Sequence, residues 1–225
     1  MNDRLRNTND WYEDRDPLSV VDHDLIDILH RAAGGRVLDL GCGLGGYSAR
    51  LRAFGHACVG LDVNASYVER ARSIGVHASV FDGATIPYPD ASFDTVFAVE
   101  VLEHVAAPER LVREISRVTG GNFIATVPNC SQVFPGGTVV FEHMLDTDHK
   151  NFFTADTFGT LLAGAFDTVN VSQIAPVNAA IVRTLVPRTL YRIFRLVQKL
   201  GLAKPTHFFR LLAHCRAPKQ GERRQ

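Results

Sequence analysis

The strongest constraint on the fold of this chain is a regular alternation of short apolar segments with segments of helical periodicity. The apolar, β-branched segments predict strands over residues 36–40, 57–61, 76–81, 93–99, 122–127, 166–173 and 208–215. Apolar residues at every third or fourth position predict helices over residues 20–33, 44–54, 65–73, 108–118, 155–163 and 187–200. Strands separated by helices favour a parallel sheet covered on both faces. We therefore predict an α/β protein with a doubly wound, mostly parallel, seven-stranded sheet. We also expect its last strand to be antiparallel.

Composition narrows the class of protein. The 225 residues contain 24 Lys and Arg against 24 Asp and Glu, so no net charge draws the chain onto nucleic acid. The four cysteines lack the spacing of a zinc site and are expected to be reduced thiols. The first residues are polar, and no apolar run reaches the roughly 20 residues that span a bilayer. These features predict a cytoplasmic protein.

Glycines follow the first predicted strand, in the segment VLDLGCGLGG. Gly41, Gly43 and Gly46 satisfy the G-x-G-x-x-G pattern of a dinucleotide-binding turn, so a nicotinamide oxidoreductase is one alternative. Asp39 argues against it, because a carboxylate there would repel a pyrophosphate and attract an ammonium group. Asp62, at the end of the second strand, can accept both hydroxyls of a ribose. The turn therefore predicts a nucleoside ligand.

Three segments taken together resemble a known family. VLDLGCGLGGYS, VGLDVN and FDGATIPYPDASFDTVFAVEVLEHV are similar to the successive motifs of the class I S-adenosylmethionine-dependent methyltransferases, especially the small-molecule branch. The resemblance runs from about Gly35 to Phe166, with the motifs in family order. It implies a Rossmann-like methyltransferase fold, S-adenosyl-L-methionine as the cofactor, and methyl transfer to a small-molecule acceptor.

The resemblance also implies roles for individual residues. Asp39, Gly41 and Gly43 would surround the methionine end of the cofactor, Asp62 would hold the ribose, and Asp82 would lie near the adenine amino group. The expected cofactor-binding residues are Asp39, Gly41, Cys42, Gly43, Asp62, Val63, Asp82, Gly83 and Val99. The alternative is that these residues have structural roles only. Gly41 and Gly43 would then form an ordinary turn, and Asp62 and Asp82 would be solvated caps after two strands.

Methyl transfer requires positioning of a nucleophile rather than a conspicuous catalytic residue. A hydroxyl acceptor also needs a base, for which the candidates are Glu100, His104, His143 and His149. We predict Glu100, His104 and His149 as the catalytic set, although a single histidine is more often structural. Methyl transfer requires no particular catalytic residue that the sequence would have to show. A protein that binds the cofactor without catalysis is therefore another alternative.

The run from Glu100 to His104 has a second interpretation. At helical spacing Glu100, Glu103 and His104 would share one face, and His149 could complete a metal site. That pattern is similar to metal-dependent enzymes that methylate the 3′-terminal 2′-hydroxyl of small RNAs. The balanced net charge argues against binding of RNA, and the spacing of these residues is not specific for a metal site. We therefore predict no metal ligands.

We expect one domain over residues 1–225. Its parts are an N-terminal cap and helix (1–33), a cofactor-binding core (34–175), a helical insertion (176–207), the last strand (208–216) and a tail (217–225). In the insertion, arginines interleaved with apolar residues over 181–200 could cap an apolar substrate or rest on a membrane surface. The favoured interpretation is a core-packed helix with a solvated basic face.

Two further segments could cover the site. Trp11 and Tyr12 could belong to a lid or to a packed arm. Gly136 and Gly137 could make a mobile lid. Thr154 is expected to cap the helix that follows it.

Overall fold

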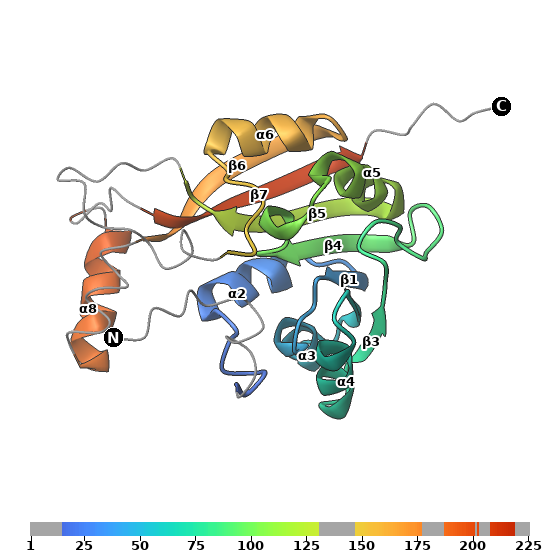
Figure 1. Ribbon diagram of the computed structural model, residues 1–225. Helices are drawn as coiled ribbons and strands as arrows, with labels where there is room; N and C mark the ends of the chain where they lie inside the picture. Colours follow the sequence, from blue (N-terminus) through green and yellow to red (C-terminus); the bar gives the residue numbers. More distant parts are fainter. Residues whose placement is uncertain (1–14, 131–146, 177–186, 201, 203–207, 219–225) are drawn as a thin grey trace.

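The computed structural model describes residues 15–130, 147–176, 187–200, 202 and 208–218 of the protein. In this part of the chain seven strands form one sheet, with helices on both of its faces (Figure 1). The predicted doubly wound α/β class is confirmed. Trp11, Tyr12, Gly136, Gly137 and His143 lie outside the described residues.

The strand order across the sheet is β3-β2-β1-β4-β5-β7-β6. The strands are β1 Arg36–Leu40, β2 Ala57–Asp62, β3 His77–Val80, β4 Phe93–Val99, β5 Thr119–Pro128, β6 Phe166–Pro176 and β7 Phe208–Pro218. The last strand, β7, runs antiparallel to β5 and β6, as predicted, and the other described pairs are parallel. The order reverses between β1 and β4, and ligands of open α/β sheets bind beyond the carboxyl ends of the strands at such a point.

The helices divide between the two faces of the sheet. They are α2 His23–Ala32, α3 Gly46–Ala53, α4 Ala65–Ser73, α5 Pro108–Val118, α6 Ala155–Ala163 and α8 Arg188–Lys199, with a short 3₁₀ helix η1 at Leu102–His104. Figure 1 shows α2, α3 and α4 on one side of the sheet and α5 and α6 on the other.

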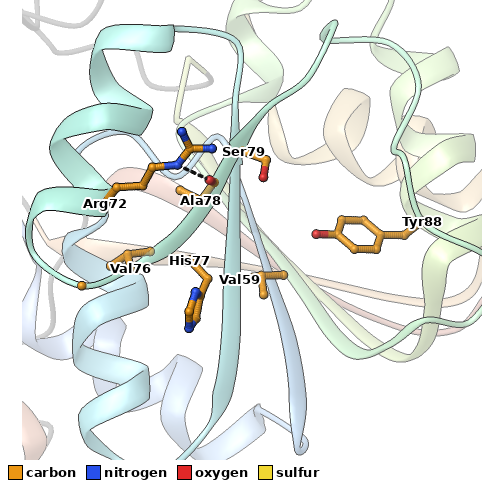
Figure 2. A pocket seen from close by; sticks show the side chains of 8 residues that line it. Val59, Arg72, Val76, His77, Ala78, Ser79 and Tyr88 are labelled. Carbon is orange, nitrogen blue, oxygen red and sulfur yellow. Dashed lines mark hydrogen bonds between the residues drawn. The ribbon is translucent and has the colours of Figure 1, made fainter.

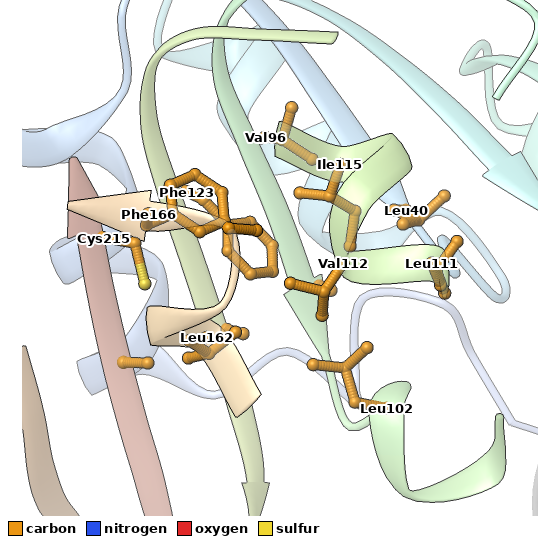
Figure 3. Packing of buried hydrophobic residues seen from close by; sticks show 14 of the residues in the cluster. Leu40, Val96, Leu102, Leu111, Val112, Ile115, Phe123, Leu162, Phe166 and Cys215 are labelled. Atoms are coloured by element: carbon orange, nitrogen blue, oxygen red, sulfur yellow. The ribbon is translucent and has the colours of Figure 1, made fainter. Parts of the chain in front are cut away.

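The core follows from the alternation of side chains along the strands. In β1, Val37 belongs to the apolar cluster shared with α2 and α3, whereas Leu38 and Leu40 belong to the cluster shared with α5. Figure 3 shows Val112 and Ile115 of α5 within the latter cluster. Burial of each such side chain stabilises the fold by about 1.5–3 kcal/mol.

Two helix starts depend on capping side chains. The apolar periodicity predicts a helix from residue 20, but α2 begins at His23 because the Asp22 carboxylate accepts hydrogen bonds from the backbone N–H groups of Asp24 and Leu25. The predicted cap at Thr154 is confirmed: Thr154 and Thr157 form a reciprocal capping box at the start of α6.

The favoured interpretation of the helical insertion is wrong. Leu190, Ile193 and Leu196 of α8 are 52%, 57% and 56% exposed, so this face of the helix is not packed in the core. The reason is its place in the fold, because α8 lies outside the two helical layers and has no sheet face to cover (Figure 1). Among the described residues, no helix is both long and apolar enough to cross a membrane.

Candidate active site

The glycine turn after β1 is held by the neighbouring strand. The N–H groups of Gly41 and Cys42 donate to the Leu61 carbonyl at 2.7 and 3.0 Å. Gly41 and Gly43 have φ angles of +74° and +51°, a region that favours glycine. A Cβ on Gly41 would clash with Val101, whereas a Cβ on Gly43 would meet nothing within 4 Å. Gly41 is therefore required by packing, and Gly43 leaves bare backbone open to a ligand.

Asp62 joins the end of β2 to this turn. Its Oδ2 accepts from the Gly43 N–H at 2.8 Å and its Oδ1 from the Asn64 N–H at 2.9 Å. The side chain is 7% exposed, and burial raises the pKa of the carboxyl. An ionised carboxylate has about four acceptor positions. Asp62 can therefore hold the turn and still accept hydrogen bonds from a ligand.

Asp39 lies beneath the turn, against α3. It is 2% exposed, and its Oδ2 accepts a hydrogen bond from the Ser48 hydroxyl at 2.7 Å. Burial raises the pKa of Asp39 to about 7, and the nearby Asp62 charge acts in the same direction. Two acidic side chains thus lie close to the turn. In their ionised form they disfavour a pyrophosphate and favour a cationic ligand, whose charge would in turn favour their ionisation.

Asp82, Gly83 and Val63 meet at the ends of β2 and β3. Asp82 is exposed, and its Oδ1 accepts from the N–H groups of Ala84 and Thr85 at 2.8 and 2.7 Å, which lowers the pKa of the carboxyl. A Cβ on Gly83 would lie 3.2 Å from Val63 Cγ1, and Val63 is 61% exposed. This corner is therefore accessible, with one carboxylate oxygen committed to the backbone.

Two other expected cofactor residues face inward. Cys42 is 8% exposed and packs with Val68 and Ala71 of α4, so its side chain belongs to the core and only its backbone lines the turn. Val99 is half-buried and packs against the apolar cluster that β1 shares with α2 and α3.

Glu100 marks the end of β4 with a strained backbone. Its φ of +55° is unusual for a residue with a side chain, and such strain is found most often at functional sites. Its Oε1 accepts from the Thr126 hydroxyl at 2.8 Å and lies 3.6 Å from Arg210 Nε. The prediction that Glu100 shares a helical face with Glu103 and His104 is wrong, because the chain turns at Glu100 before η1 begins.

The ion pair of Glu100 extends into a network. Arg210 Nη1 lies 3.2 Å from Asp22 Oδ2, and the Asp22 N–H donates to the Tyr47 hydroxyl at 3.0 Å. The Arg210 and Glu100 side chains are 29% and 28% exposed. With Thr126 of β5, this network joins α2, α3, β4, β5 and β7 at the carboxyl edge of the parallel strands.

A second group of side chains lies beside it. One ligand atom from each of Glu103, His104 and His149 lies within 4.8 Å of the others, and the two imidazole rings are 4.7 Å apart. These residue types could hold a divalent cation. The prediction thus brought His104 and His149 together correctly, with Glu103 rather than Glu100 as the neighbouring carboxylate.

The segment that carries His149 is also bound to η1 by its backbone. The N–H groups of Lys150 and Asn151 donate to the Glu103 carbonyl at 2.7 and 3.0 Å, and Asn151 Nδ2 donates to the carbonyls of Leu102 and Val105. These bonds give the segment a structural role before α6.

A pocket of about 440 Å³ opens elsewhere, beside the edge strand β3 (Figure 2). Arg72 Nε donates to the Ala78 carbonyl at its side. The lining residues are Val59, Arg72, Gly75, Val76, His77, Ala78, Ser79 and Tyr88. None of the predicted site residues lines it, so we do not assign it to the active site.

Sequence reasoning missed Ser48, Asp22, Arg210 and Asn151. Asp22 had a detectable signal, since an aspartate before an apolar periodic segment is a typical helix cap. Arg210 had no detectable signal in the sequence, because it lies 188 residues from Asp22 in the chain. Only the antiparallel placement of β7 beside β5 brings it to Glu100.

Comparison with known proteins identifies similar chains. Residues 38–125 match a family model described as a methyltransferase domain. The 27-O-demethylrifamycin SV methyltransferase of Amycolatopsis mediterranei (strain S699) is 36% identical over 103 residues, which is 42% of this chain and 38% of the relative. A probable S-adenosylmethionine-dependent methyltransferase of Mycolicibacterium smegmatis (strain ATCC 700084 / mc(2)155) is 37% identical over 114 residues, 48% of this chain and 44% of the relative. This chain thus spans less than half the length of these two relatives.

A solved structure shares the fold. The S-adenosylmethionine-dependent methyltransferase from Mesorhizobium loti has a TM-score of 0.62 at 22% identity, over 86% of this chain and 96% of that chain. At this identity the likeness concerns the fold alone.

Proposed function

We propose that this chain, which belongs to the class I S-adenosylmethionine-dependent methyltransferases, transfers a methyl group from S-adenosylmethionine to a small-molecule acceptor. The observation that supports this most strongly is the bond between Asp62 and Gly43, which joins an acidic strand end to an open glycine turn. The relative named for 27-O-demethylrifamycin SV supports an acceptor of small size.

The residues at the turn fit this cofactor. Gly43 leaves space for it, Asp62 has acceptor capacity for the ribose hydroxyls, and Asp82 with Gly83 would lie at the adenine. Bound S-adenosylmethionine supplies an electrophilic methyl group on a positively charged sulfur. The charges of Asp39 and Asp62 favour such a cation over the phosphates of a nicotinamide dinucleotide.

The end of β4 would orient the acceptor. Thr126 and Arg210 hold the Glu100 carboxylate in place, so Glu100 can accept a hydrogen bond from an acceptor hydroxyl or amine. Positioning of this kind can supply a large part of the rate enhancement of a displacement reaction. His104 and His149, which contact each other, are the candidates to take up the acceptor proton.

A second candidate function is metal-dependent methylation of an RNA 2′-hydroxyl. The arrangement of Glu103, His104 and His149 within 4.8 Å favours it. Two observations count against it: Glu100 is committed to Arg210 and Thr126, and the chain as a whole has no net positive charge.

Calorimetry tests the cofactor assignment. S-adenosylhomocysteine should bind, NADH should not, and Asp62→Ala should weaken binding of S-adenosylhomocysteine by about 1–3 kcal/mol through lost charged hydrogen bonds. Asp27→Ala is the matched control, because Asp27 is 61% exposed on α2 and pairs only at 4.0 Å with Arg31. Equal affinities of the two variants, or binding of NADH, would contradict the assignment.

A screen with radiolabelled cofactor tests the transfer itself. Incubation with small hydroxyl and amine compounds, and separately with short RNA, should label a small molecule. Cofactor binding without label in any acceptor would instead favour a non-catalytic binding protein.

A further inference from the structure

The helix α8 presents an unusual apolar surface. Leu190, Ile193, Leu196 and Leu200 follow one another at spacings of three, three and four residues, so they lie along one side of the helix. Each is more than half exposed, at 52%, 57%, 56% and 64%. We call these four residues the α8 stripe. A continuous stripe of this kind in water marks an interaction surface.

The opposite side of α8 faces the protein. Arg195 Nη2 lies 3.0 Å from Asp24 Oδ2 of α2, and the Arg195 side chain is only 26% exposed. Tyr191, Phe194 and Gln198, which share that side, are half-buried. The helix is therefore attached to the body in one orientation, with the stripe directed outward.

The stretch of sequence that contains α8 has charged residues of one sign only. Between residues 168 and 219 the chain has nine Lys and Arg and no Asp or Glu, although the whole chain is neutral. Within the helix, Arg192 is exposed next to Ile193. A basic helix with an exposed apolar side fits an anionic bilayer surface, where apolar residues enter the acyl boundary and basic residues contact headgroups.

The position of α8 relates it to the active site. It follows β6 and precedes β7, so it lies beyond the carboxyl edge of the parallel strands, where the glycine turn and Glu100 also lie. It is joined to α2, whose cap Asp22 pairs with Arg210 of the Glu100 network. In Figure 1 it stands apart from the sheet on this side.

We propose that the α8 stripe docks the protein on an anionic lipid bilayer. This goes beyond the proposed function and does not depend on it. The helix lies in the plane of the interface, the four apolar side chains enter the membrane, and the basic residues beside them contact lipid phosphates. The catalytic edge of the sheet is then held close to the membrane surface.

Sedimentation of the full chain with vesicles tests this. The wild type should bind vesicles of phosphatidylcholine with phosphatidylglycerol, and bind vesicles of phosphatidylcholine alone much more weakly. The double variant Ile193→Gln/Leu196→Gln should bind the anionic vesicles at least about tenfold more weakly, since two apolar side chains no longer enter the bilayer. Arg192→Gln should weaken binding to the anionic vesicles a few-fold, which is about what one basic residue contributes near an anionic membrane surface.

The controls separate docking from misfolding and from other partners. Ile74→Gln replaces a 39% exposed apolar residue at the end of α4, outside the stripe, and should bind vesicles like the wild type. If S-adenosylhomocysteine binds the wild type, all variants should bind it with the same affinity. Loss of vesicle binding alone would then reflect docking, and absence of S-adenosylhomocysteine binding in every protein would reflect failure of the proposed function. Three results would overturn the proposal: equal binding to neutral vesicles, a dimer in light scattering that dissociates in the double variant without vesicle binding, or binding to RNA in place of vesicles.

Discussion

The two ends of the active site are built in different ways. The glycine turn takes its polar contacts from a short stretch of chain, between Asp39 and Asp62, and its carboxylates are buried and bonded to nearby donors. The Glu100 network takes its contacts from five elements, with partners separated by up to 188 residues, and its charges are more than a quarter exposed. Buried carboxylates shift in pKa, whereas half-exposed ion pairs contribute little to stability. The turn should therefore be the more sensitive of the two regions to substitution.

The largest expected effect is on the pH dependence of stability, through Asp39. Its pKa is about 7 in the folded protein and ordinarily 3.8. Well below pH 3.8 the carboxyl is protonated in both states. As the pH rises toward 7 it ionises first in the unfolded chain, so the free energy of unfolding falls, and it levels off above the folded-state pKa. Between pH 4 and pH 8 the free energy of unfolding of the wild type should fall by about 4 kcal/mol more than that of Asp39→Asn. Urea unfolding at both pH values measures this, and parallel pH profiles would contradict it.

The next effect distinguishes the two glycines of the turn. Gly41→Ala places a methyl group against Val101 at positive φ and should reduce the free energy of unfolding by about 2–4 kcal/mol. Gly43→Ala has the same backbone strain but open space, and should cost about 1 kcal/mol. Only Gly43→Ala should weaken binding of S-adenosylhomocysteine in a protein of near-normal stability. If both variants unfold at the same urea concentration, the distinction between packing and ligand space is lost.

A smaller effect is expected at the other end of the site. Arg210→Met removes the cation between Glu100 and Asp22 and should reduce stability by about 1–2 kcal/mol. A double-mutant cycle with Glu100→Gln should give a coupling of about 0.5–1 kcal/mol, because both groups are partly exposed. Arg31→Met, in an exposed pair at 4.0 Å, is the control and should change stability by less than about 0.5 kcal/mol. A coupling above about 3 kcal/mol would show that this end is as tightly built as the turn.

The smallest effect is the one expected from metal removal. The backbone bonds from Lys150 and Asn151 to the Glu103 carbonyl already fix the segment of His149 against η1. Chelator should therefore leave the melting temperature and the affinity for S-adenosylhomocysteine unchanged. His149→Ala should not alter the response to chelator. A melting temperature that falls with chelator in the wild type but not in His149→Ala would instead favour the metal-dependent candidate.

The sequence by itself determined the layered fold and the glycine turn. Both depend on local signals: apolar periodicity for the strands and helices, and glycines directly after a strand for the turn. Asp62 was found because it ends a strand whose carboxyl end lies at the ligand edge of a parallel sheet, whereas Asp82 came from the family resemblance. The seven strands followed from the apolar periodicity, whereas the antiparallel direction of β7 was an expectation that no local signal carried.

Only the tertiary structure decided how the acceptor side is assembled and which face of α8 is exposed. The helical spacing of Glu100, Glu103 and His104 was misleading because one positive φ at Glu100 turns its side chain toward β5 and β7. The apolar residues of α8 have a periodicity that is equally consistent with a core helix and with a surface helix. Pairing between distant strands, and the availability of a sheet face to cover, are properties of the whole chain, so no local pattern encodes them.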